Sequence, residues 1–331
     1  MFRGSSMHTS SSNLKSLCLT AVLGLMLLYL PVPGQAEESD AEADETGRVM
    51  TVDEIAKELS NPVTALRSIF NDFEYRSFDG DLRGSGGQDS WIYLLTPSIP
   101  FQLDNGKNIL LRATIPFNLN QPVWETWYGH PIWEEGRSYT EWLLRQSPQV
   151  TDDSGRFFRG HDHLADVTFD AAYGGVSDGG FISMFGIAGV FPSSQDISTS
   201  RDQFLLGPEV ALGKSADWGV IGAWATHLVD ISGDSGFKTN ETTIKVFFAY
   251  GLGNGWQIIS NPTILYDWEA DSGNELLLPI GAGVSKTTRF GRTPVKFEIE
   301  LQKYIETSRR FGPEWLFTFS ITPVLSKTYF D

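Results

Sequence analysis

After about residue 60, the chain is a series of short segments in which apolar and polar side chains alternate. In the clearest segment, 294–304, the apolar side chains share one face: Val295, Phe297, Ile299 and Leu301. The polar and charged side chains share the other: Lys296, Glu298, Glu300 and Gln302. Because successive side chains of a strand point to opposite faces, such a segment needs an apolar environment on one side and water or ionic partners on the other. Repeated along a chain, this pattern predicts a transmembrane β-barrel.

The spacing of these segments predicts how the strands are connected. Turn signals separate twelve segments, at 66–78, 90–103, 108–119, 163–174, 180–191, 202–213, 218–228, 241–250, 256–266, 276–286, 294–304 and 315–325. Short connections (104–107, 177–179, 215–217, 251–255, 289–293) alternate with long ones (79–89, 120–162, 192–201, 229–240, 267–275, 305–314). An up-and-down barrel with both termini in the periplasm has this alternation, whereas a Greek-key sandwich does not. We therefore expect an all-β, antiparallel transmembrane barrel of about 12 strands over residues 63–331.

Residues 1–36 have the features of a secretory signal peptide. Arg3 and Lys15 supply positive charge, an apolar run follows from Leu17 to Leu30, and the small residues near Ala36 suit cleavage before Glu37. The run is shorter than the roughly twenty apolar residues of a spanning helix, so a cleaved signal is favoured over an anchor. The expected location is the outer membrane, reached after secretion across the inner membrane.

Charge and cysteine content exclude several classes of function. The net charge of −16 argues against nucleic acid as a partner, because nucleic acids are bound through basic patches. The single cysteine, Cys18, lies in the signal, so the mature chain would have neither disulfides nor thiolate metal ligands. No phosphate loop or nucleotide fingerprint is present. We expect no cofactor.

A short helix is predicted between the signal and the barrel. Residues 37–50 form an acidic leader that is expected to be disordered. Thr51 and Glu54 then have the spacing of a capping box, and Pro62 ends the helical pattern, which gives a helix within 51–62. Because so short a helix is unstable alone, it should dock at the periplasmic end of the barrel or inside it.

Aromatic residues lie where the interfaces of a bilayer would be. Trp218, Trp256 and Trp315 each begin a predicted strand, and Tyr250 ends one. The last strand places four apolar side chains outward: Trp315, Phe317, Phe319 and Ile321. Outer-membrane barrels usually end in such a strand with a terminal aromatic residue, whereas here Phe330 is followed by Asp331. Membrane lipid and the barrel-assembly machinery are the expected partners, together with a small-molecule solute.

Several stretches carry a resemblance to a known family. They include Asn61-Pro62-Val63, Leu94 to Phe101, Gly207-Pro208, Gly255-Trp256, Tyr266-Asp267-Trp268-Glu269 and Gly312-Pro313-Glu314-Trp315. They resemble the bacterial outer-membrane transporters that are named for the meta-pathway of phenol degradation. The resemblance covers most of residues 55–325 and is absent from 121–160. It implies an outer-membrane barrel that passes small or hydrophobic molecules.

The strand alternation also selects candidate residues for the barrel lumen. They are charged or polar and lie in the middle of strands: Arg112, Asp166, Asp170, Glu209, His227, Lys245, Asn261, Lys296, Glu298 and Glu300. These residues could line a pore and set its selectivity, or form pairs that fill a narrow interior. Both interpretations stay open at this point.

The long connection 120–162 is rich in tryptophan. Trp124, Trp127, Trp133 and Trp142 alternate with glutamates in what would be an extracellular loop. These tryptophans could contact an apolar or sugar-like ligand and gate the mouth of the barrel. Alternatively, the loop could pack only against itself.

Histidines provide the remaining candidates for chemistry. His161, Asp162 and His163 could bind a metal, but the absence of a third, distant histidine favours simple surface residues, so no metal site is expected. His227 is placed opposite Trp218 and Trp224 on its strand and hence in the lumen. A lipid-acting barrel enzyme centred on it would need a serine nucleophile that the sequence does not single out. We therefore expect a passive channel or facilitator, with such an enzyme or an adhesive surface protein as alternatives.

Overall fold

The computed structural model describes residues 50–125, 156–160, 162–194, 200–233 and 238–325. The predicted signal peptide and the acidic leader up to residue 49 lie outside the described residues. So do Trp127, Trp133, Trp142 and His161, and the C-terminal pair Phe330 and Asp331.

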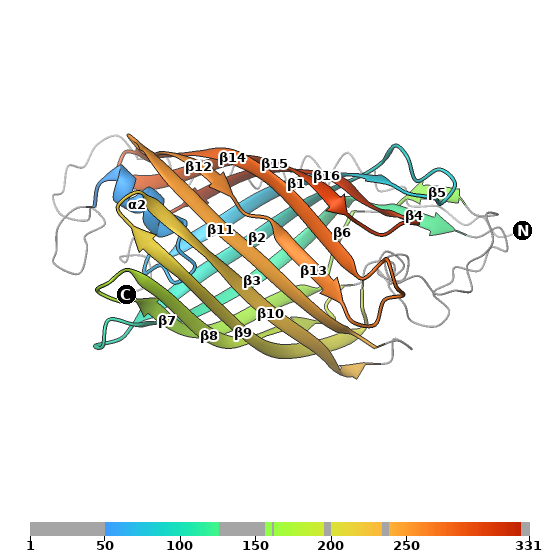
Figure 1. Ribbon diagram of the computed structural model, residues 1–331, viewed down its shortest axis with the longest axis horizontal. Helices are drawn as coiled ribbons and strands as arrows, with labels where there is room; N and C mark the ends of the chain where they lie inside the picture. The colour runs from blue at the N-terminus through green and yellow to red at the C-terminus, as the bar shows by residue number, and fades with distance from the viewer. Residues whose placement is uncertain (1–49, 126–155, 161, 195–199, 234–237, 326–331) are drawn as a thin grey trace, which may run out of the picture. The chain divides into compact units, whose positions relative to one another are not determined.

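Antiparallel strands form a closed barrel (Figure 1). In chain order they are β1 (Ser68–Asp79), β2 (Gln88–Gln102), β3 (Asn108–Asn120), β7 (Val167–Val176), β8 (Phe181–Phe191), β9 (Gln203–Ala216), β10 (Gly219–Gly233), β11 (Asn240–Gly253), β12 (Trp256–Ser260), β13 (Thr263–Asp267), β14 (Leu276–Phe290), β15 (Thr293–Glu306) and β16 (Gly312–Pro323). β1 pairs with β16 and closes the sheet. Because β12 and β13 are two parts of one interrupted strand between β11 and β14, the barrel has 12 strands, as the alternation predicted.

The interruption between β12 and β13 falls at Asn261 and Pro262. Proline has no N–H for a ladder hydrogen bond. The Asn261 N–H donates instead to the Glu300 carboxylate, at 2.8 Å. The single strand predicted over 256–266 is therefore two short strands. They are joined by Asn261 and Pro262, where the backbone N–H of Asn261 bonds a side chain instead of a neighbouring strand.

Tight turns lie at one end of the barrel and long connections at the other. The long connection between β3 and β7 contains the hairpin of β4 (Pro122–Glu125) and β5 (Arg156–Arg159) and the short β6 (His163–Leu164), which pairs with β3. Figure 1 shows this hairpin at the end opposite to α2 (Val52–Leu59). We call these the long-loop end and the short-turn end.

The outer surface of the barrel is apolar along its length. Outward-facing side chains such as Ile187, Leu212, Ile280, Ile299 and Leu301 are about half exposed. Aromatic side chains occur at both ends: Trp218, Tyr250 and Trp256 at the short-turn end, and Trp91, Trp268 and Trp315 at the long-loop end. This arrangement suits a hydrocarbon layer bordered by two interfaces. In the part of the chain that the structure describes, no helix has the length and hydropathy to span a bilayer.

α2 is capped as its sequence predicts and docks at the short-turn end. Thr51 Oγ1 accepts from the Glu54 N–H at 3.2 Å, and the Thr51 N–H donates to the Glu54 carboxylate at 2.7 Å. Asp53 accepts hydrogen bonds from the N–H groups of Asn254 and Gly255 in the β11–β12 turn. The residues that follow the helix therefore enter the barrel from this end.

Candidate functional site

The barrel encloses a cavity of about 690 Å³. Its wall carries many hydroxyl groups: Thr96, Ser98, Thr114, Thr168, Thr226, Thr243, Thr263, Thr318 and Ser320. Apolar side chains lie between them: Phe70, Leu94, Trp224, Phe247, Leu265, Leu277 and Leu316. The cavity can therefore accommodate a small molecule that has both polar and apolar surface.

The residues after α2 form the floor of the cavity. Leu59, Ser60, Asn61, Pro62 and Thr64 line it from the short-turn side, and we call residues 59–64 the floor segment. Two wall cations hold this segment. Lys296 Nζ donates to Ser60 Oγ at 2.8 Å, and Arg112 Nη1 donates to the Pro62 carbonyl at 3.1 Å.

The interior below the floor segment is filled with apolar side chains. Val63 belongs to a buried cluster with side chains from seven strands: Leu110, Ala172, Ile182, Met184, Ala211, Val220, Phe247, Ala249 and Ile259. Asn108 Nδ2 adds a hydrogen bond to the Val63 carbonyl at 3.0 Å. The barrel thus combines the two alternatives left open by the sequence: its short-turn end is filled, and its middle holds a cavity.

Arg112 is the centre of the most extensive polar cluster in the wall. Its guanidinium lies 2.8 Å from Asp170 Oδ2, and its Nε bonds both carboxylate oxygens. It also lies over the Trp224 ring, 4.0 Å from the ring centroid. Trp224 Nε1 in turn donates to Glu209 at 3.0 Å. A guanidinium satisfies a carboxylate and an aromatic face together, which an ammonium does poorly.

Three other wall carboxylates have partners on their own or a nearby strand. Glu298 pairs with Lys296 at 2.9 Å, although the Lys296 side chain is only 2% exposed. Glu300 accepts from Asn261 Nδ2 at 3.1 Å as well as from the Asn261 N–H. On β1, Glu74 pairs with Arg76 at 2.6 Å. Such pairing offsets the cost of placing charges in the barrel interior.

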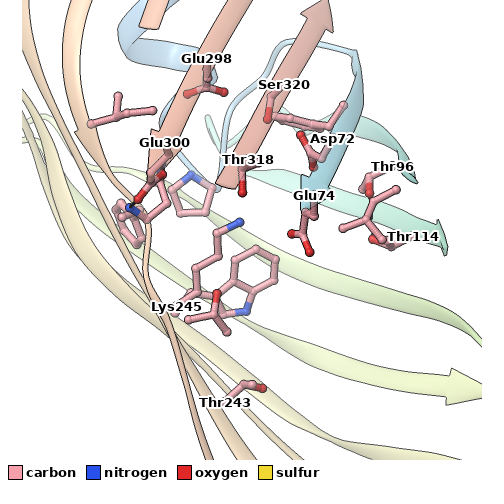
Figure 2. A pocket seen from close by; sticks show the side chains of 18 of the residues that line it. Asp72, Glu74, Thr96, Thr114, Thr243, Lys245, Glu298, Glu300, Thr318 and Ser320 are labelled. Atoms are coloured by element: carbon pink, nitrogen blue, oxygen red, sulfur yellow. Dashed lines mark hydrogen bonds between the residues drawn. The ribbon is translucent and has the colours of Figure 1, made fainter. Parts of the chain in front are cut away.

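Lys245 and Asp72 complete the charged groups of the wall. Asp72 is hydrogen-bonded to Ser320 and feels the positive charge of Lys245. Lys245 is an exposed side chain on the cavity wall, and Figure 2 shows it extending into the cavity.

Seven of the ten residues assigned to the lumen from the sequence lie on the cavity wall: Arg112, Asp170, Lys245, Asn261, Lys296, Glu298 and Glu300. Glu209 is buried and contacts the Trp224 indole, so it supports a wall residue without lining the cavity. Asp72, Glu74 and Arg76 of β1 also line the cavity, although they were not among the candidates from the sequence. Their alternation with Phe73 and Tyr75 was a signal that could have identified them.

Asp166 lies outside the cavity and holds a connection at the long-loop end. Its carboxylate accepts hydrogen bonds from the N–H groups of Ser194 and Arg201, at 2.9 and 2.7 Å. It also accepts from the Ser200 hydroxyl at 3.3 Å. The residue precedes β7, which begins at Val167, so the prediction of an inward mid-strand position is wrong.

The prediction that His227 faces the lumen is also wrong. Trp224 and Thr226 line the cavity, so His227 lies on the outer face of β10. Its Nδ1 lies 2.9 Å from Thr242 Oγ1, which also accepts from Trp268 Nε1 at 2.9 Å. The error came from assigning Trp224 to the lipid, whereas this tryptophan packs inside against Arg112. Among the described residues, no carboxylate orients the other ring nitrogen of His227, as a catalytic histidine requires.

The loop candidates are only partly within the described residues. Trp124 lies on β4, where its backbone pairs with Phe157 of β5. His163 Nε2 lies 3.1 Å from Asn118 Nδ2. The described residues contain no group of three or more His, Cys, Asp or Glu side chains that could hold a metal ion.

The chain resembles known proteins in its fold but not in its sequence. No protein-family model and no curated protein matches the sequence. Among solved structures, the chain resembles an outer membrane channel from Pseudomonas putida F1, with a TM-score of 0.51 and 10% identity over 88% of this chain and 100% of that one. A Pseudomonas aeruginosa FadL homologue gives 0.37 and 10%, over 81% and 93%. Outer membrane phospholipase A from Escherichia coli gives 0.36 and 9%, over 79% and 97%. At these identities the likeness concerns the fold alone, which is that of an outer-membrane β-barrel.

Proposed function

We propose that this protein is an outer-membrane channel through which small molecules, including hydrophobic or aromatic ones, diffuse passively. The observation that carries the proposal is a cavity of about 690 Å³ inside a closed barrel, lined by both hydroxyl and apolar groups. A barrel that served only as an anchor would have no need for such a lined interior. The apolar outer surface with aromatic residues at both ends supports insertion in a membrane.

Passage through the barrel requires the floor segment to move. It is held to the wall by the hydrogen bonds from Lys296 and Arg112, and Asp53 fixes the preceding helix to the β11–β12 turn. The floor segment is thus held by a few polar contacts and is not itself a strand of the barrel. Displacement of residues 51–64 would join the cavity to the short-turn end without breaking the barrel ladder.

The chemistry of the wall supports passive transport rather than catalysis. The charged pairs and hydroxyl groups of the wall can solvate a solute during passage. We assign the selectivity of the channel to these wall residues. Contact with an incoming solute is assigned to Trp124, Trp127, Trp133 and Trp142 of the long connection.

Liposome swelling tests the function directly. The purified full-length protein, reconstituted in liposomes, should admit a neutral solute that the bare bilayer excludes, such as arabinose, and planar bilayers should show stepwise current. Asp53→Ala should raise the swelling rate, because it removes the carboxylate that holds the β11–β12 turn to α2. Asp178→Ala is the control, since this exposed aspartate lies in another turn at the same end. If correctly folded wild-type and Asp53→Ala barrels both exclude every solute, the channel proposal is wrong.

A further inference from the structure

The five carboxylates of the cavity wall all have hydrogen-bonding partners. Asp72 is bonded by Ser320, Glu74 by Arg76, Asp170 by Arg112, Glu298 by Lys296 and Glu300 by Asn261. Glu74, Asp170 and Glu298 each face a cation, whereas the partners of Asp72 and Glu300 are neutral groups. Each wall carboxylate thus has a protein donor, and none of them needs the Lys245 ammonium as its hydrogen-bonding partner.

The cations of the wall differ in whether they have a carboxylate partner. Arg76, Arg112 and Lys296 each form an ion pair with a carboxylate. Lys245 makes no hydrogen bond and no ion pair with any residue that the structure describes, and it is exposed although it lies inside a barrel. Its side chain extends into the cavity in Figure 2. Lys245 is thus the cation with donors available to a solute.

The surroundings of Lys245 provide both polar and apolar contacts. Lys245 lies on β11, where its backbone is opposite Trp224 of β10 on one side and Thr263 of β13 on the other. Both of these residues also line the cavity. Phe247 follows on the same inward face of β11. A bound molecule could place an anionic group at the ammonium and an apolar body against the Trp224 and Phe247 side chains.

We propose that Lys245 is the specificity-determining residue of the cavity and that the preferred solute is a small amphipathic anion, such as a carboxylate on an apolar body. This inference rests on the proposed channel function and names the substrate class of the same cavity. A charge-assisted hydrogen bond from an ammonium to a carboxylate is stronger than one between neutral groups. Neutral molecules of the same shape would fit the cavity but would lack this contact.

Three solutes with the same ring test the proposal: benzoate, benzyl alcohol and benzylamine. Binding to the full-length protein in lipid nanodiscs is measured by titration calorimetry at low ionic strength. Benzoate should bind in preference to the other two, and Lys245→Met should weaken benzoate binding about tenfold or more, as expected for loss of one charge-assisted contact. Lys245→Arg keeps the charge and should retain most of the affinity. Lys303→Met is the matched control, because Lys303 lies on the outer face over the Trp315 ring.

The outcomes separate this inference from the proposed function. Equal binding of benzoate to the wild type and Lys245→Met, or no preference over benzyl alcohol, would overturn the role of Lys245. If neutral solutes still cause swelling in that case, the channel function stands and only the anion preference is lost. If benzoate binds through Lys245 but no solute permeates, the site is real and the channel function is wrong. Heat-modifiable gel mobility, which folded barrels show, checks that each variant is folded before it is scored.

Discussion

Arg112 binds three different partners in the barrel interior: the Asp170 carboxylate, the Trp224 ring and the Pro62 carbonyl. The first two contacts stabilise the wall, and the third fixes the floor segment. A single side chain therefore couples the stability of the barrel to the closure of its short-turn end. Candidate lumen residues of this kind cannot be called only structural or only functional.

Removal of Arg112 should destabilise the barrel strongly. In Arg112→Ala the Asp170 carboxylate keeps its interior position without its cation, and breaking a buried ion pair from one side costs about 3–5 kcal/mol. The Arg112→Ala/Asp170→Asn double variant should recover much of this loss, because no unpaired charge remains. Urea unfolding in lipid vesicles, followed by tryptophan fluorescence, measures the free energies. An Arg112→Ala barrel as stable as the wild type would mean that the pair contributes nothing.

At the scale of an element, α2 is stabilised by its cap and by docking rather than by its length. It has 8 residues, too few for stability in isolation. Ile55, Ala56 and Leu59 are buried, and the Thr51–Glu54 capping box satisfies N–H groups at its start. The sequence predicted both the helix and its cap, because both are local patterns.

Loss of the cap should loosen α2 without affecting the strands. Thr51→Ala removes the hydroxyl that accepts from Glu54, which costs about 1 kcal/mol of helix stability. Hydrogen exchange of the α2 amides, measured by mass spectrometry, should become about fivefold faster, while exchange in β15 and β16 is unchanged. Faster exchange throughout the barrel would show instead that α2 supports the whole fold.

At the scale of the whole molecule, the period-two pattern predicted the strands and their order, because each strand has to present one face to lipid. The same pattern failed to tell the inner face from the outer on β10. Near the short-turn end both faces are apolar, as the buried inner residues Val220 and Ala249 show. The entry of the floor segment into the barrel also could not be predicted, since it depends on contacts between residues far apart in the sequence.

A pair of neighbouring positions on β15 and β16 tests the orientation of the barrel wall toward lipid. Ile299 is 47% exposed on the outer face, whereas Thr318, opposite Glu300, lines the cavity. Ile299→Lys should destabilise the folded barrel in vesicles by about 2–4 kcal/mol if it lies near the bilayer midplane. Thr318→Lys should cost much less and should alter ion selectivity. Equal costs in urea unfolding would contradict the assignment of the two faces.

Each ion pair of the wall joins residues of one strand or of two adjacent strands. Glu74–Arg76 and Lys296–Glu298 lie within one strand, and Arg112–Asp170 joins β3 to β7. Within the described residues, none of these pairs bridges the lumen from one side to the other. A solute that travels along the axis would therefore not have to break and re-form an ion pair at each passage. The main barrier to passage would then lie in residues 59–64, which close the short-turn end while the ion pairs of the wall stay intact.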